Sequence, residues 1–267
     1  MKPTVLQRVL PPLFFLLSGA VALYVLCFAA HPDGSRTLVW AEVWQLAILA
    51  VIAGGLTVSL LRRAASRFWW EVILNATIFL GVWFLFLLLG VSLGTAIALS
   101  SGLTLVYMFY RTVWTHDIFY LLGAIGVAIN FAMWLPGKVL LIGLVAFTIY
   151  DMVAGAPGGP IHKLVAMLTQ YSLVPGMIIP KNLKGFTENL QQAIKGEAIF
   201  LGAGDLILPL SLVAGAALKG WQPAVFVALG AVLGAAWLGF GTDLRPRPAL
   251  PPLAIGAGIP FLFFSIF

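Results

Sequence analysis

Long apolar runs recur along the whole chain, and they constrain its fold more than any other feature. The 267 residues are 61% hydrophobic and 9% charged, and their mean hydropathy is +1.05, far from the usage of soluble globular proteins. A backbone that crosses a hydrocarbon core of about 30 Å must satisfy its own hydrogen bonds, so such runs predict spanning helices. The sequence therefore predicts an all-α, multi-pass integral membrane protein that folds as a single domain in the lipid bilayer.

Charges, prolines and glycines bound nine apolar runs, which predict a polytopic bundle of nine transmembrane helices. A turn near Gly90 to Ser92 is expected between the third and fourth runs, because one helix over both would be about 58 Å long, roughly twice the core thickness. Spans one to six thus occupy about 9–155, a cytoplasmic connection about 156–197, and spans seven to nine about 198–267. The nine runs lie near residues 9–30, 41–61, 72–90, 94–110, 118–135, 138–155, 198–217, 221–240 and 249–267.

Basic residues are distributed unequally between the two ends of these spans. Of the 15 Lys and Arg residues, only Arg36, Lys138 and Lys219 fall on one side, and the other twelve fall on the side of the N-terminus. Cytoplasmic loops carry the excess of basic residues, so we expect a cytoplasmic N-terminus and an external C-terminus. The basic residues form no dense cluster, so no nucleic-acid partner is expected. Cys27 is the sole cysteine, which excludes a disulfide framework and a thiol metal site.

The connection at 156–197 contains an apolar stretch, Leu164 to Ile179. About 16 residues interrupted by Pro175-Gly176 make an unfavourable span. The stretch is predicted to be a surface segment at the lipid boundary. The alternative is a mobile gate over the site described next.

Small residues at helical spacing predict close helix packing in two places along the chain. They are Gly90, Gly94, Ala98 and Gly102 in the third and fourth runs, and Gly230 and Gly234 in the eighth.

Two aspartates, Asp151 and Asp205, lie inside the sixth and seventh runs. An aspartate at a span centre costs about 2.5 to 3.5 kcal/mol, so it is retained where it faces a partner, a water cavity or a reaction. Counted from the predicted cytoplasmic ends, the two lie at about 9 and 12 Å, so antiparallel neighbouring helices would hold them at similar depth. Two close carboxyl groups share a proton. One can then take a proton from water while the other donates to a carbonyl oxygen, as in aspartic proteases.

The neighbours of the two aspartates suggest a substrate site. Gly202-Ala203-Gly204 leaves space for another backbone just before Asp205. Tyr150 could donate a hydrogen bond or line the site, although an aromatic residue near a membrane boundary is usually an anchor. Prolines around Pro248-Ala249-Leu250 predict irregular backbone, which membranes tolerate where it lines a cavity.

Taken together, Tyr150-Asp151, the Gly-x-Gly-Asp (GxGD) motif at 202–205 and the Pro-Ala-Leu (PAL) motif at 248–250 resemble the intramembrane aspartyl proteases of the presenilin and signal peptide peptidase family. The resemblance covers the architecture of the whole chain and implies a hydrolase that cuts peptide bonds within transmembrane helices. It implies Asp151 and Asp205 as the catalytic pair, with Pro248 to Leu250 positioning the substrate. The central motif residue, commonly Leu in the family, is Ala203 here.

The resemblance further implies a prokaryotic homologue of archaeal type, located in the cell membrane, that acts on transmembrane protein or peptide substrates. No metal, organic cofactor or obligatory partner subunit is implied. Two alternatives stay open. One is a prepilin-type membrane aspartyl peptidase, and the other is a proton or cation pathway that uses the same carboxylates.

Overall fold

The computed structural model describes residues 4–24, 67–155, 167–195, 198–240 and 248–266. The predicted second span, 41–61, lies outside these residues, as do the end of the first span and the opening of the connection. The helices and strands are α1 (Val5–Tyr24), α3 (Arg67–Leu88), α4 (Leu93–Phe109), α5 (Val113–Trp134), α6 (Gly137–Ala154), β1 (Gly176–Ile179), η2 (Leu183–Thr187), α8 (Leu190–Lys195), β2 (Ile199–Gly202), α9 (Ala203–Ala217), α10 (Trp221–Phe240) and α11 (Leu250–Ile266).

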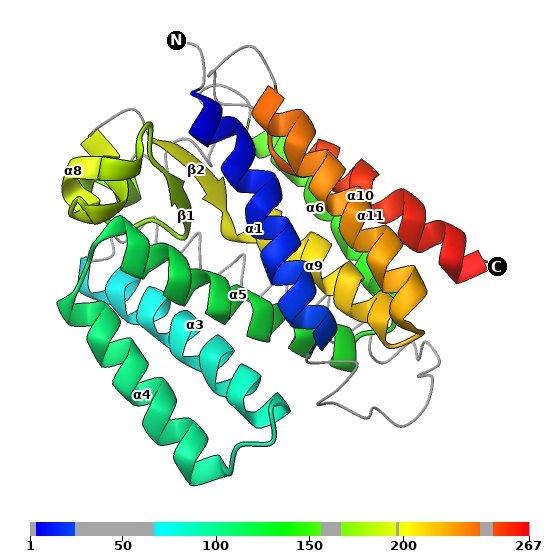
Figure 1. Cartoon of the computed structure of the whole chain (residues 1–267), viewed down its shortest axis with the longest axis horizontal. Helices are drawn as coiled ribbons and strands as arrows, with labels where there is room; N and C mark the ends of the chain where they lie inside the picture. The colour runs from blue at the N-terminus through cyan, green and yellow to red at the C-terminus, as the bar shows by residue number, and fades with distance from the viewer. Residues whose placement is uncertain (1–3, 25–66, 156–166, 196–197, 241–247, 267) are drawn as a thin grey trace.

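Helices built from the predicted apolar runs dominate the structure (Figure 1). Among the described residues, five helices are long and apolar enough to cross a membrane, namely α1, α3, α5, α6 and α10. The apolar helices α4, α9 and α11 are shorter. These helices support a multi-pass helical membrane protein, whereas the count of nine spans stays a prediction.

The turn between the third and fourth predicted spans is confirmed. Gly90 has a φ of +77°, a conformation that glycine adopts without a Cβ clash. The Ser92 hydroxyl then accepts a hydrogen bond from the Thr95 N–H and so caps the start of α4. The two helices pack against each other as a hairpin.

Helix α9 lies at the centre of the bundle. It contacts α1, α5, α6, α10 and α11, and its residues from Pro209 to Ala216 are all buried. In Figure 1, α1 crosses in front of α9, with α3, α4 and α5 on one side and α6, α10 and α11 on the other. A central helix enclosed in this way can hold a polar side chain away from lipid.

A small two-stranded sheet corrects the all-α prediction. β1 and β2 pair antiparallel, with Gly176 opposite Gly202 and Ile179 opposite Ile199. The predicted seventh span therefore begins as a strand, and its helix starts at Ala203. The surface interpretation of Leu164 to Ile179 is wrong for the strand at its end, because Met177, Ile178 and Ile179 are completely buried.

The two predicted glycine packing sites have different outcomes. Gly230 and Gly234 of α10 face the backbone of Gly256 and Pro252 in α11 so closely that a Cβ would clash, which confirms the close approach. In α4, a Cβ on Gly94 or Gly102 would meet no described atom within 4 Å. The packing prediction for that stripe is therefore wrong with respect to the residues that the structure describes.

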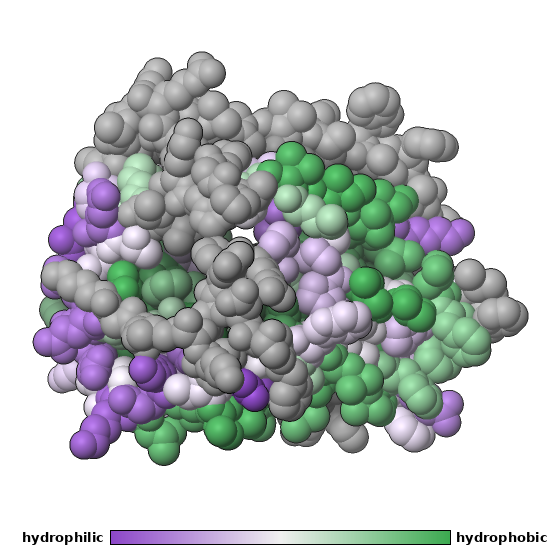
Figure 2. Space-filling view, turned by 90° about the horizontal axis from the view of Figure 1, so that it is seen from above, coloured by the Kyte–Doolittle hydropathy of each residue, from purple (hydrophilic) through white to green (hydrophobic). Residues whose placement is uncertain are grey.

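The end of the bundle that carries the sheet is its more polar end. The Thr4 hydroxyl donates to the Lys181 carbonyl, and the Leu190 N–H donates to the Arg111 carbonyl, so the N-terminus and the connection meet there. Lys138 and Lys219 lie at helix ends on the opposite side. Figure 2 shows hydrophilic residues gathered toward the side of the sheet and α8, and hydrophobic residues over much of the rest. Which end is cytoplasmic stays a prediction.

Candidate active site

Asp151 lies in the last turn of α6, three residues before its end at Ala154. Three residues correspond to about 4.5 Å, which is less than the predicted depth because the helix ends before Pro157. The Asp151 Oδ2 accepts a hydrogen bond from the backbone N–H of Leu250 at 3.2 Å. This contact connects one predicted catalytic residue with the predicted Pro-Ala-Leu segment across 99 positions of sequence.

The Pro-Ala-Leu segment forms the entry into α11. The first backbone N–H groups of a helix have no partner within the helix, but Pro251 and Pro252 have no N–H to satisfy. The Leu250 N–H is the first donor of α11, and Asp151 accepts from it. Pro248 and Ala249 are half-buried and precede the helix, whereas Leu250 is buried. The irregular backbone predicted for this segment therefore lies beside Asp151.

Asp205 lies in the first turn of α9 and not deep inside a helix as predicted. Its Oδ2 accepts a hydrogen bond from the Gly202 N–H at 3.0 Å, which closes the start of the helix. A carboxylate at this end of a helix also interacts favourably with the helix dipole. The depth estimate failed because residues 199–202 are a strand.

The two aspartates approach each other across helices in mutual contact. α6, α9 and α11 pack pairwise, and the two aspartates lie at the same end of this group, in the last turn of α6 and the first turn of α9. Asp151, Asp205 and Leu250 thus lie in one region, at the end of the bundle that carries the sheet.

The remaining predicted site residues differ in their surroundings. Ala203 donates its N–H to the Pro175 carbonyl at 3.0 Å. A Cβ on Gly202 would lie 3.1 Å from the Asp205 Oδ2, whereas Gly204 is exposed and would tolerate one. The Tyr150 side chain is 55% exposed, on an outer part of α6. A role for Tyr150 in substrate binding stays a prediction.

A buried polar network that sequence reasoning missed supports the sheet from α5. The Asp117 Oδ1 accepts from the Ile178 N–H of β1 at 2.9 Å, and the His116 Nε2 lies 2.8 Å from the Gly176 carbonyl. A carbonyl accepts only, so Nε2 donates, and in the neutral ring Nδ1 accepts from the Tyr107 hydroxyl at 3.0 Å. The signal in the sequence is the His116-Asp117 pair directly before the predicted fifth span.

This network leaves β2 with an open edge. Because the N–H of Ile178 and the carbonyl of Gly176 point to α5, β1 bonds to β2 through its other residues, Met177 and Ile179. The peptide groups of Phe200, opposite Ile178, then point away from β1. The sheet has two strands, so within the described part of the chain no strand pairs with this edge.

Within the described ranges no three His, Cys, Asp or Glu residues are grouped as a metal site would require.

Comparisons with known proteins identify the fold. Neither a family model nor a curated protein matches the sequence. Two solved structures match almost the whole chain, and each is described as a presenilin family intramembrane aspartate protease. The structure in space group C222 has a TM-score of 0.62 and 20% identity, over 97% of this chain and 98% of that chain. The structure in space group P2 has a TM-score of 0.61 and 23% identity, over 97% of each. The chain therefore has the fold of the presenilin family intramembrane aspartate proteases.

Proposed function

We propose that this protein is an intramembrane aspartyl protease that hydrolyses peptide bonds within transmembrane segments of membrane proteins. The observation that carries the proposal is the meeting of Asp151, Asp205 and the start of α11 in one region of a bundle with this fold. Asp151 and Asp205 act as the general acid and base.

The hydrogen bonds of the two carboxyl groups suit this role. In each aspartate a backbone N–H holds Oδ2, from Leu250 in one case and from Gly202 in the other. Among the described residues no hydrogen bond involves either Oδ1 atom, so we assign these atoms to water and substrate. One ionised carboxylate takes a proton from water as the water oxygen attacks the amide carbon, and the protonated partner donates to the carbonyl oxygen.

The substrate must be extended at the site, because the amides of an intact helix are satisfied and enclosed. The open edge of β2 offers the N–H and C=O of Phe200 to such a segment by strand addition. Since β2 runs directly into Gly202-Ala203-Gly204-Asp205, a paired substrate would lie next to Asp205. Pro248 and Ala249 form the opposite wall, beside Asp151.

The setting of the enzyme is part of the proposal. We place it in a prokaryotic cell membrane, with a cytoplasmic N-terminus, an external C-terminus and no obligatory partner subunit. The basic residues at the sheet end support this orientation. Tags at the two termini, probed with protease in oriented vesicles, test it. Digestion of the N-terminal tag from the external side would reverse the assignment.

Cleavage of a generic transmembrane peptide by the purified protein in detergent tests the mechanism. We expect Asp151→Asn and Asp205→Asn each to lower the rate by about 10² to 10⁴-fold, the usual contribution of a positioned acid or base. Glu188→Gln is the matched control, because it removes an exposed acid at the same end of the bundle and should leave the rate unchanged. Parental cleavage by either Asn variant would exclude the paired-acid mechanism.

The two alternative functions give other outcomes in the same experiment. A prepilin-type peptidase would cleave a leader peptide but not the generic transmembrane peptide. A proton or cation pathway would move ions across proteoliposomes and cleave neither. No contact among the described residues favours either alternative over the proposed protease.

A further inference from the structure

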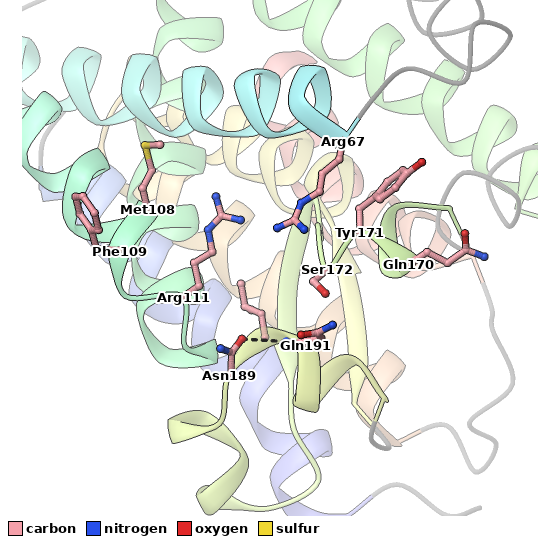
Figure 3. Close-up of a pocket in the computed structure, with 10 residues that line it drawn as sticks. Arg67, Met108, Phe109, Arg111, Gln170, Tyr171, Ser172, Asn189 and Gln191 are labelled. Atoms are coloured by element: carbon pink, nitrogen blue, oxygen red, sulfur yellow. Dashed lines mark hydrogen bonds between the residues drawn. The ribbon is translucent and has the colours of Figure 1, made fainter.

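A polar cavity of about 320 Å³ lies at the sheet end of the bundle, away from the two aspartates. It opens where α3 begins, α4 ends and α5 begins. Two arginines line it, Arg67 and Arg111, together with polar residues of the connection. Figure 3 shows both guanidinium groups beneath the start of α3, with Ser172, Asn189 and Gln191 below them.

The net charge of the groups that line this cavity is positive and only partly neutralised. Arg67 Nε and Arg111 Nη1 both bond to one oxygen of Glu71, at 2.9 and 3.0 Å. Two guanidinium groups and one carboxylate leave one net positive charge. The cavity is therefore suited to an anion with several acceptor oxygens, which arginine binds through paired hydrogen bonds.

The connection supplies the other wall of the cavity. Ser172 has a φ of +57° and ends a helical turn: its N–H bonds to the Thr169 carbonyl, and the Leu173 N–H bonds to the Leu168 carbonyl. The Asn189 Oδ1 accepts a hydrogen bond from the Gln191 N–H. This bond holds the Asn189 side chain in one orientation and leaves its amide nitrogen as a donor. Hydroxyl and amide donors therefore lie within the same cavity as the arginines.

The rim of the cavity toward α4 is apolar. Met108 and Phe109 line it, and Phe109 is 81% exposed. Phe68 of α3 and Leu105 of α4 are also exposed, in helices that hydropathy places in lipid. A ligand of this cavity would meet cationic donors at one end and hydrocarbon-compatible surface at the other.

We propose that this cavity binds the phosphate head group of an anionic membrane lipid. Arginine forms paired hydrogen bonds with phosphate oxygens, and basic pockets between helices at a membrane boundary recognise such head groups. The acyl chains then lie along Met108 and Phe109. The site is separate from the proposed protease site, and its occupancy can be measured without any cleavage assay.

Native mass spectrometry of delipidated protein in neutral detergent, titrated with phosphatidylglycerol or phosphatidylcholine, tests the proposal. We expect tighter binding of phosphatidylglycerol than of phosphatidylcholine, and an increase in the Kd of phosphatidylglycerol of about 30-fold in the Arg67→Gln/Arg111→Gln double variant. The matched control is Lys181→Gln/Lys184→Gln, which removes two charges from the connection outside the cavity lining. Its Kd should equal that of the parent.

Two further measurements test whether the positive charge of the cavity drives binding and whether the bound phosphate belongs to a lipid. Glu71→Gln removes the opposing charge and should tighten phosphatidylglycerol binding. If the double variant does not fold, Arg67→Gln alone serves, because Arg67 is 59% exposed. Millimolar inorganic phosphate should not displace the lipid, and displacement would show a soluble-anion site instead. Equal Kd values for parent and arginine variants, or weaker binding in Glu71→Gln, would overturn the proposal.

Discussion

Replacing Asp117 by alanine should release strand β1 from helix α5. Its Oδ1 is the acceptor for the Ile178 N–H at 2.9 Å, and Ile178 is completely buried. An unsatisfied buried donor costs about 1 to 3 kcal/mol, so the middle of this range, about 2 kcal/mol, corresponds to about 30-fold in a local opening equilibrium. Asp117→Asn keeps an oxygen acceptor and should stay within about 1 kcal/mol of the parent.

Hydrogen–deuterium exchange of the peptide that contains β1 measures this effect. In Asp117→Ala the β1 amides should exchange about 30-fold faster than in the parent, while a peptide from α10 exchanges at the parental rate. Faster exchange in α10 as well would indicate global unfolding. Equal β1 exchange in the Ala variant and the parent would refute the claim that Asp117 holds the strand. Since β1 supports β2 and β2 leads to Asp205, proteolysis should fall together with protection.

Two further changes test the sheet edge and the helix contacts. Phe200→Pro removes an N–H from the open edge of β2 and should lower kcat/KM about 3 to 10-fold, as one lost hydrogen bond would. The protection of β1 from hydrogen exchange should not change in this variant. Leu201→Pro breaks the hydrogen bonds between β1 and β2 and should also expose β1 to exchange. Equal kcat/KM in Phe200→Pro and the parent would remove this edge from substrate binding. Gly234→Ala should destabilise the bundle by about 1 to 3 kcal/mol in detergent unfolding, because its Cβ would meet the Pro252 carbonyl. Gly102→Ala should not, because a Cβ at Gly102 has open space around it. Equal effects of the two variants would place the close contact elsewhere.

Hydropathy predicted the helices well because an apolar run long enough to span a membrane has few other stable conformations. α10 occupies its predicted residues, 221–240, and α4 and α6 differ from theirs by about one residue at each end. Hydropathy failed at β1. Gly176 to Ile179 are apolar because protein encloses them, and an apolar sequence does not distinguish a protein interior from lipid.

The sequence singles out the residues of the candidate site but does not give their geometry. Asp151 and Asp205 stand out because acids are rare in apolar runs. That Asp151 accepts from Leu250 depends on the place where α6 ends and α11 begins, and helix boundaries are the least reliable feature of a sequence-based prediction. Asp117 was missed for the same reason, since α5 begins at Val113 and so contains Asp117, which the predicted span leaves outside.

Asp151 and Asp205 lie in the terminal turns of their helices. Water, the second reactant of a hydrolytic reaction between them, therefore has a short path to the site. Each carboxyl lies about one helical turn, or about 5 Å, from a helix end. Solvent entering from the sheet end need not cross the centre of the bilayer to reach them. Consumption of water would then draw on one face of the membrane, and the opposite face could stay sealed throughout a catalytic cycle.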